Sequence, residues 1–179
     1  MFVDFPDIAA IRPSPDRVRE TLFNWLQNQI VGTHCLDLFA GSGALGIEAL
    51  SRGAAEVVFV DREPQIGRHL TQTLQRLGAT GATVQVEDST RYLNRLERPF
   101  DVVFLDPPFA SPLLQAAFAR LPHGWLAPEA HIYVECPADT PLPPLPPGWT
   151  VYRSKQAGQV GYHLLRATAI RTHSAAEVR

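Results

Sequence analysis

The sequence predicts a single α/β domain whose mostly parallel, seven-stranded sheet ends in an antiparallel hairpin. Short β-branched runs that end at an acid or a turn alternate with segments of helical periodicity. At this spacing the alternation requires right-handed crossovers, which build a parallel sheet covered by helices on both faces. Two adjacent strand patterns near the C-terminus account for the hairpin, and the chain of 179 residues has room for one domain.

Seven segments carry the strand pattern. The five expected parallel strands are residues 34–39, 56–61, 83–88, 101–106 and 131–136. A proline-rich connector at residues 137–148 is too poor in backbone donors to form a helix. Beyond it, residues 149–155 and 160–168 are two further strands, and the short turn between them predicts an antiparallel hairpin.

Three segments place apolar residues at helical spacing. The first follows Ser14, the second begins at Pro64 and stops at Gly78, and the third follows Ser111. The apolar positions are Val18, Leu22, Leu26 and Ile30; Ile66, Leu70, Leu74 and Leu77; and Leu114, Ala117, Phe118 and Leu121. We therefore expect one domain over residues 11–168, with an N-terminal extension at 1–10 and a polar tail at 169–179.

Composition narrows the class of protein. The net charge of −2 argues against a protein that coats nucleic acid without specificity. The sequence has no bilayer-length apolar run and no secretory signal, so we expect a soluble, cytoplasmic protein. We also expect it to be a monomer. Cys35 and Cys136 lie in apolar runs and are expected to be buried free thiols. The six histidines lack metal-ligand spacing, so no metal is expected.

A glycine-rich turn follows the first strand. Gly41, Gly43 and Gly46 satisfy the pattern G-x-G-x-x-G, which lets a ligand approach the backbone at a helix N-terminus. The pattern is shared by dinucleotide-binding enzymes and by methyltransferases, so it predicts a nucleotide-like ligand without choosing between them.

Acidic residues at three successive strand ends favour a methyltransferase over a dinucleotide-binding enzyme. Asp37 at the mouth of the turn would repel a pyrophosphate but favour a sulfonium ligand with an α-ammonium group. Asp61 can accept both ribose hydroxyls, and Asp88 with Ser89 would hold the adenine amine. Strand-end aspartates also commonly cap turns. The expected S-adenosylmethionine site consists of Asp37, Phe39, Gly41, Gly43, Asp61, Arg62, Asp88 and Ser89.

The most specific motif is Asp106-Pro107-Pro108-Phe109, directly after the fourth strand. It resembles the [D/N]PP[F/Y] motif of amino-methyltransferases that act on adenine N6, guanine N2 or glutamine. The prolines stiffen the loop. The Asp106 carboxylate and the Pro107 carbonyl can accept hydrogen bonds from an amine, and Phe109 offers a stacking face for a flipped base. Asp106, Pro107 and Phe109 are therefore the expected catalytic residues.

Four segments resemble the signatures of the RsmD-type rRNA methyltransferase family. They are residues 12–26 (RPSPDRVRETLFNWL), 37–53 (DLFAGSGALGIEALSRG), 104–109 (FLDPPF) and 155–162 (KQAGQVGY). The resemblance implies a Rossmann-like class I methyltransferase fold. It also implies methylation of guanine N2 in 16S rRNA, at position 966 in conventional rRNA numbering, within the small subunit or its assembly intermediate. Ser14 departs from the usual threonine, and the family's basic N-terminal hairpin is expected to be absent.

The basic residues that could contact rRNA phosphates are Arg12, Arg17, Arg19 and Lys155. An ion pair of the arginines with Asp16 or Glu20, or a solvated helix face, explains them equally well.

Three other functions fit parts of the sequence. A nicotinamide-binding protein would account for the glycines but not for the proline loop. An adenine-N6 DNA methyltransferase or a protein-glutamine methyltransferase would share both motifs. A non-catalytic RNA-binding module would not need an intact Asp106.

Overall fold

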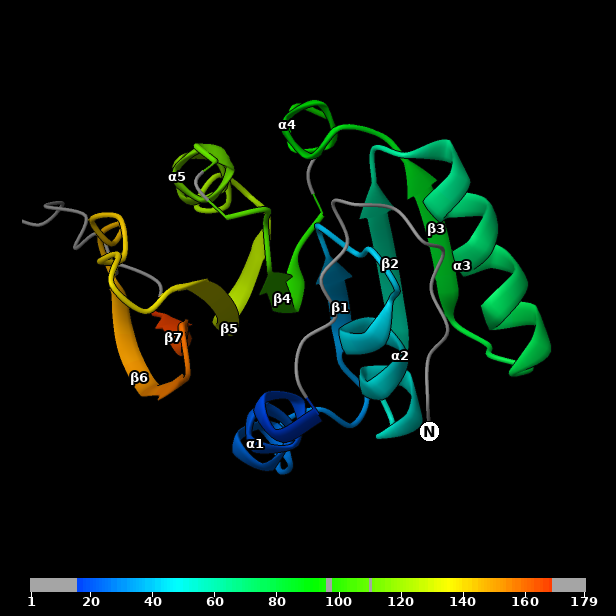
Figure 1. Ribbon diagram of the computed structural model, residues 1–179, viewed down its shortest axis with the longest axis horizontal. Coiled ribbons are helices and arrows are strands. Elements are labelled where there is room, and N and C mark those ends of the chain that lie inside the picture. Colours follow the sequence, from blue (N-terminus) through cyan, green and yellow to red (C-terminus); the bar gives the residue numbers. More distant parts are fainter. Residues whose placement is uncertain (1–15, 96–97, 110, 169–179) are drawn as a thin grey trace, which may run out of the picture.

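A computed structural model describes residues 16–95, 98–109 and 111–168 (Figure 1). Its sheet has seven strands in the order β3-β2-β1-β4-β5-β7-β6, which confirms the expected architecture. The strands are β1 (His34–Asp37), β2 (Glu56–Asp61), β3 (Ala82–Val86), β4 (Phe100–Leu105), β5 (Leu126–Pro137), β6 (Trp149–Ala157) and β7 (Val160–Ala167). The helices are α1 (Asp16–Leu26), α2 (Ala44–Ser51), α3 (Pro64–Arg76), α4 (Ser89–Tyr92) and α5 (Leu113–Arg120).

The direction of the strands changes once across the sheet. Strands β1 to β5 are parallel, whereas β7 runs antiparallel to both β5 and β6. Pro137 at the end of β5 pairs with Val160 at the start of β7, so the hairpin turn lies at the carboxyl edge of the parallel strands. The chain order reverses between β1 and β4, which is where open α/β sheets bind their ligands.

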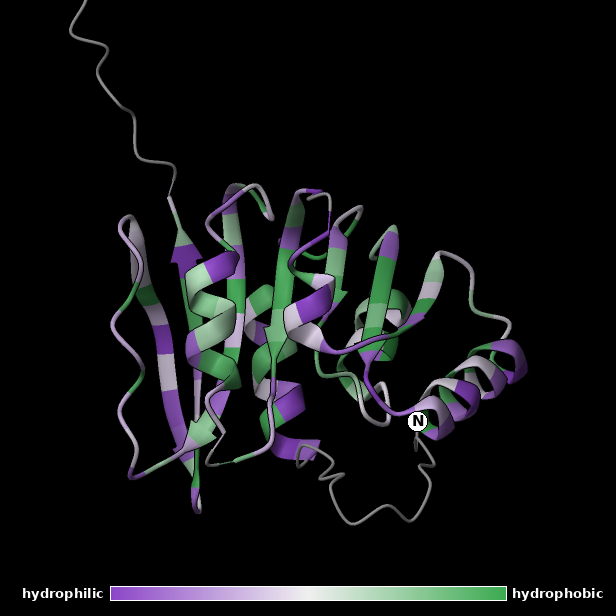
Figure 2. Cartoon of the chain, turned by 90° about the horizontal axis from the view of Figure 1, so that it is seen from above, coloured by the Kyte–Doolittle hydropathy of each residue, from purple (hydrophilic) through white to green (hydrophobic). Residues whose placement is uncertain are grey.

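Two apolar layers hold the helices against the sheet. Neighbouring residues of a strand point to opposite faces. Thus Cys35 packs with α1, α2 and α3 on one face, whereas Leu36 packs with α4 and α5 on the other. Figure 2 shows the hydrophobic residues concentrated along the central strands. By contrast, edge strand β6 is exposed from Thr150 to Gln156.

Several boundaries differ from the sequence-based expectation. Strand β5 begins at Leu126 and reaches β4 through a bulge, where Phe100 pairs with Leu126 and Val102 with His131. Strands β1 and β3 end two residues earlier than expected because the chain turns there into the glycine loop and into α4, a short helix that the pattern did not indicate. Leu77 follows α3 as its C-cap and is 45% exposed instead of belonging to the apolar stripe.

The buried thiols and the helix start at Pro64 are as expected, whereas several other predicted residues lie outside the described part of the chain. Cys35 and Cys136 are buried free thiols, and Pro64 occupies the first turn of α3. Within the described ranges no helix is long and apolar enough to cross a membrane, and no group of three metal-ligating side chains occurs. Arg12 and Ser14 lie outside the described residues, as do segments 1–10 and 169–179.

Candidate active site

The glycine turn joins β1 to α2 at the carboxyl edge of the sheet. Gly41 and Gly43 have φ angles of 54° and 79°, in the left-handed region that favours glycine. A Cβ on Gly43 would lie 2.4 Å from Leu70 Cδ2, and one on Gly46 would lie 2.3 Å from Phe59 Cε1. Gly43 and Gly46 therefore bring α2 close to α3 and β2. The half-buried Gly41 is the more accessible glycine of the turn.

Asp37 lies beneath this turn rather than in the open. Its side chain is buried, and its Oδ2 accepts a hydrogen bond from the Gly46 amide at 3.1 Å. Burial raises the pKa of Asp37 to about 8, although the Gly46 hydrogen bond works against the shift; nearby Asp61 adds to it. A positive charge close to the turn would favour the ionised carboxylate.

The raised pKa of Asp37 makes stability depend on pH. The pKa in the folded chain is about 8, above the ordinary value of 3.8, so folding favours the protonated carboxyl. The contribution of the protonated Asp37 side chain to the free energy of unfolding should be complete below pH 3.8 and should be lost as the pH rises toward 8. Denaturant unfolding of the cofactor-free protein across this window should show a smaller pH dependence for Asp37→Asn than for wild type. Identical pH profiles would contradict the assignment.

Asp61 connects the end of β2 to the glycine turn. Its Oδ2 accepts a hydrogen bond from the Gly41 amide at 3.0 Å, and its Oδ1 accepts one from the Glu63 amide at 3.0 Å. The predicted pair of Asp61 and Gly41 is therefore in direct contact. Arg62 is exposed, and its Nε lies 3.5 Å from Glu63 Oε1.

The remaining predicted cofactor residues lie at the ends of β1 and β3. Phe39 is half-buried, two residues after the end of β1. Asp88 is the N-cap of α4: its Oδ1 accepts hydrogen bonds from the amides of Thr90 and Arg91, at 2.9 and 3.2 Å. Asp88 thus caps a turn, as the sequence analysis considered. Both hydrogen bonds are accepted by Oδ1, and neither of them uses Oδ2. Ser89 is the first residue of α4.

The Asp-Pro-Pro-Phe loop follows β4, between the ends of β1 and β5. Pro107 is buried, Asp106 and Phe109 are half-buried, and Pro108 is exposed. The Ser111 hydroxyl donates a hydrogen bond to the Pro108 carbonyl at 2.8 Å, which ties the loop to the start of α5. The expected catalytic residues are thus held at the carboxyl edge, next to the strand that leads into the glycine turn.

A buried polar pair beside this loop was not predicted. The Tyr133 hydroxyl donates a hydrogen bond to Glu135 Oε1 at 2.5 Å, and both residues lie within the apolar strand β5. Burial raises the pKa of Tyr133 well above its usual value, and the charges of Glu135 and Asp106 add to the shift. The sequence offered one indication, a lone glutamate between Val134 and Cys136.

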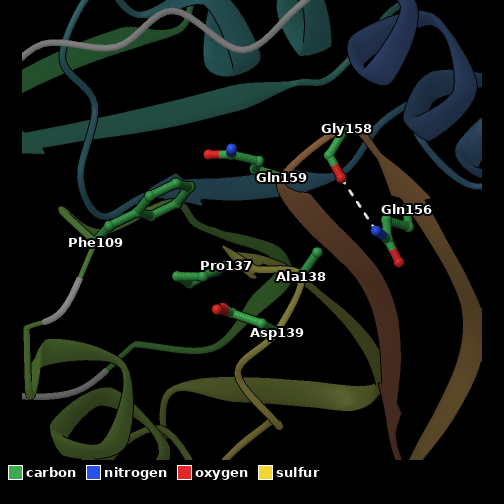
Figure 3. A pocket seen from close by; sticks show the side chains of 7 residues that line it. All are labelled: Phe109, Pro137, Ala138, Asp139, Gln156, Gly158 and Gln159. Carbon is green, nitrogen blue, oxygen red and sulfur yellow. Dashed lines mark hydrogen bonds between the residues drawn. The ribbon is translucent and has the colours of Figure 1, made fainter.

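A pocket of about 560 Å³ lies on the hairpin side of the loop (Figure 3). It is lined by Phe109, Pro137, Ala138, Asp139, Gln156, Gly158 and Gln159. A backbone hydrogen bond of 2.8 Å from the Ala138 amide to the Gln159 carbonyl joins two of its walls. Only Phe109 was predicted as a site residue. The other lining residues lie in the proline-rich connector and the hairpin, and the KQAGQVGY segment was a sequence signal only for those in the hairpin.

Three of the predicted RNA-contacting residues are described by the structure, and they lie on two elements, α1 and β6. Arg19 on α1 forms an ion pair with Asp16, with Nη2 and Oδ1 3.0 Å apart, as the alternative interpretation expected. Arg17 is exposed on the same helix, and Lys155 is exposed on edge strand β6.

Comparisons with known proteins agree with this geometry. The family described as "Conserved hypothetical protein 95" matches residues 3–166. Ribosomal RNA small subunit methyltransferase D of Escherichia coli (strain K12) is 46% identical over 165 residues, which cover 92% of this chain and 83% of that protein. The protein of the same name from Haemophilus influenzae is 44% identical over 160 residues, covering 86% and 82% of the two chains.

A solved structure from Escherichia coli superimposes with a TM-score of 0.86 at 44% sequence identity and covers 92% of each chain. The Rossmann-like methyltransferase fold expected from the sequence is therefore confirmed. The glycine turn after β1 and the Asp-Pro-Pro-Phe loop after β4 lie within the matched residues. The chain belongs to the Conserved hypothetical protein 95 family, which is the RsmD family of methyltransferases.

Proposed function

We propose that this enzyme transfers a methyl group from S-adenosylmethionine to the exocyclic N2 of a guanine in small-subunit 16S rRNA. The guanine is the one at position 966 in conventional rRNA numbering. The observation that carries the proposal is the Asp106-to-Phe109 loop at the carboxyl end of β4, beside the glycine turn. Relatives named for the small-subunit rRNA support the class of substrate. The reaction would take place in the cytoplasm, on a small subunit or its assembly intermediate.

The residues around the glycine turn fit the proposed cofactor. S-adenosylmethionine carries positive charge and ribose hydroxyls but no phosphate. The Asp61 carboxylate beside the turn would repel a pyrophosphate, whereas a cationic cofactor would favour the ionised form of buried Asp37. Asp61 is held by two backbone amides, and Gly41 beside it has no side chain to block an approaching ribose. The methionine part would lie against the glycine turn and the adenine amine near Asp88 and Ser89.

Replacing Asp61 with alanine should weaken cofactor binding about ten- to a hundred-fold. The reason is the loss of a charged hydrogen-bond acceptor, which typically costs roughly 1.5–3 kcal/mol. Calorimetric titration with S-adenosylmethionine measures the change. Gln75→Ala is the control, because Gln75 is exposed near the end of α3 and is not among the predicted cofactor residues. Unchanged affinity in the Asp61 variant would refute its assignment to the ribose.

The proposed mechanism is direct methyl transfer. Bound S-adenosylmethionine would supply a methyl group already activated by the sulfonium. The lone pair of guanine N2 is delocalised into the ring, so the chain must orient the amine and let it become pyramidal. The Asp106 carboxylate and the Pro107 carbonyl would accept hydrogen bonds from its two N–H groups and offset the positive charge that develops on nitrogen. As the C–N bond forms and the C–S bond breaks, S-adenosylhomocysteine would leave, and one proton would pass from the amine to Asp106 or to water. Phe109 would stack on the extruded base and hold it in line.

Exposed basic residues are the proposed contacts to rRNA phosphates. Arg17 and Lys155 are exposed, and neither forms an ion pair with another of the described residues. Charge removal in Arg17→Gln and Lys155→Gln should reduce the salt dependence of binding to small subunits, because each phosphate contact releases counterions. Cofactor affinity should stay at the wild-type value. If the slope of the logarithm of the binding constant against the logarithm of salt concentration is unchanged, the two residues do not contact rRNA phosphates and are solvated surface residues.

The class of acceptor is tested by methyl incorporation from labelled S-adenosylmethionine. Small subunits that lack the modification, duplex DNA and a glutamine-containing protein substrate are offered to the same enzyme preparation. The proposal expects label in the small-subunit RNA. Label in adenine of DNA or in protein would instead support one of the other amino-methyltransferase functions that the loop motif permits.

A further inference from the structure

We propose that Asp139 and Gln159 recognise the target guanine by its N1–H donor and O6 acceptor, in the pocket behind Phe109 (Figure 3). This inference rests on the proposed guanine-N2 activity and adds the residues that select the base. The four observations that carry it are the position of the pocket, the direction of the two side chains, the hydrogen bonds that hold its walls, and the chemistry of the two groups.

The pocket lies on the substrate side of the catalytic loop. The loop follows β4, which has β1 on one side and β5 on the other. The cofactor residues lie at the ends of β1, β2 and β3, whereas the pocket is formed by the end of β5 and by the β6–β7 turn. Phe109 belongs both to the catalytic loop and to the pocket wall. A base stacked on Phe109 would therefore extend into this pocket, away from the cofactor.

Two polar side chains face that space. In Figure 3 the carboxylate of Asp139 and the amide of Gln159 both extend toward the Phe109 side of the pocket. Gln156 lies on the other side of the turn, where its Nε2 donates a hydrogen bond to the Gly158 carbonyl at 3.1 Å. Asp139 and Gln159 are thus the polar groups best placed to meet the edge of a base.

The walls that carry these side chains are fixed to each other. The Ala138 amide donates a 2.8 Å hydrogen bond to the Gln159 carbonyl, so the residue before Asp139 is joined to Gln159 itself. Cys136 and Gly161 are paired in the β5–β7 ladder, and a Cβ on Gly161 would lie 3.6 Å from Ala138 Cα. The connector therefore lies within van der Waals distance of the start of β7 at this point. Such pre-organisation is what selective recognition requires.

The Asp139 carboxylate and the Gln159 amide are complementary to the hydrogen-bonding groups of guanine but not to those of a 6-aminopurine. An ionised carboxylate only accepts hydrogen bonds, whereas a glutamine amide can donate them. Guanine offers a donor at N1 beside an acceptor at O6. A purine with a 6-amino group offers an acceptor at N1 beside a donor, so it would face Asp139 with an unprotonated nitrogen. Flipped bases are commonly distinguished by hydrogen bonds of this kind along their Watson–Crick edge.

The test separates base selection from methyl transfer. Small subunits are reconstituted with rRNA that carries either guanosine or 2,6-diaminopurine riboside at the target position; both bases present the 2-amino group. The ratio of kcat/KM for the two acceptors is compared among wild type, Asp139→Ala, Gln159→Ala and the control Gln75→Ala, whose side chain is exposed on α3. Wild type and the control should prefer guanosine. Each pocket variant should lose about ten-fold or more of that preference.

The outcomes distinguish this inference from the function on which it rests. If wild type methylates neither acceptor, the proposed guanine-N2 activity itself fails. If wild type methylates both equally well, or if the variants lose rate on both acceptors while their ratio is unchanged, base recognition by Asp139 and Gln159 is overturned. Both side chains are exposed, so the variants should fold; equal thermal unfolding temperatures confirm that a changed ratio reflects recognition.

Discussion

Replacing Asp106 with alanine is expected to lower methyl transfer by at least ~100-fold while leaving the affinity for S-adenosylmethionine unchanged. Asp106 lies directly after β4, and its charge is one of the causes that raise the pKa of the buried Tyr133 hydroxyl. The carboxylate is proposed to engage the acceptor amine only as it reacts, so its removal should act on the transition state. Single-turnover methyl transfer at saturating cofactor measures this step alone.

A conservative variant provides the control for Asp106. Asp106→Asn keeps an oxygen that accepts a hydrogen bond from the amine, so it should be substantially more active than Asp106→Ala. Equal losses in both variants would indicate that the negative charge, rather than hydrogen bonding, is what the reaction needs. Transfer by the alanine variant at a rate near that of wild type would contradict the proposed mechanism.

Replacing Phe104 with alanine is expected to lower the free energy of unfolding by about 3–5 kcal/mol. Phe104 is fully buried in β4, and its ring centroid lies 6.0 Å from that of Phe23 on α1 and 6.4 Å from that of Tyr133 on β5. Its removal would leave a cavity between a helix and two strands. Natural domains have a stability of only roughly 5–15 kcal/mol, so the loss is a large fraction of the total.

Chemical denaturation measures the change, and Val151→Ala on β6 serves as the control. Val151 is 49% exposed, and a surface substitution of this kind typically changes stability by no more than about 0.5 kcal/mol. A Phe104 variant as stable as the Val151 variant would show that α1 is not held to the sheet through this ring.

The strand pattern predicted the sheet well because apolar runs that are buried on both faces are unmistakable in the sequence. Residues 56–61 form β2 with the expected bounds, and both hairpin strands lie where the turn placed them. The pattern failed where a tertiary contact overrides local preference. The pattern placed this strand at residues 131–136, yet Pro128 and Glu129 also belong to β5, where a bulge accommodates them and Glu129 has a φ of 60°.

The site was predictable to the extent that parallel strands bring their carboxyl ends to one edge. That rule placed Asp37, Asp61 and Asp106 together without knowledge of their contacts. It could not distinguish a ligand-facing carboxylate from a buried one: Asp37 bonds to Gly46 beneath the turn, and Asp88 caps α4. The pocket at the hairpin depends on neighbours far apart in sequence, which no local pattern encodes. Tyr133 and Glu135 are only two residues apart on β5, but the apolar strand pattern around them does not show that their side chains are hydrogen-bonded.

Identification of the methylated nucleotide tests the central claim most directly. Small subunits that lack the modification are incubated with the enzyme and labelled S-adenosylmethionine, and the 16S rRNA is digested and analysed by mass spectrometry. The proposed function predicts one labelled product, N2-methylguanosine, from the fragment that contains position 966. A label on any other nucleobase atom, or on a guanine elsewhere in the RNA, would contradict it.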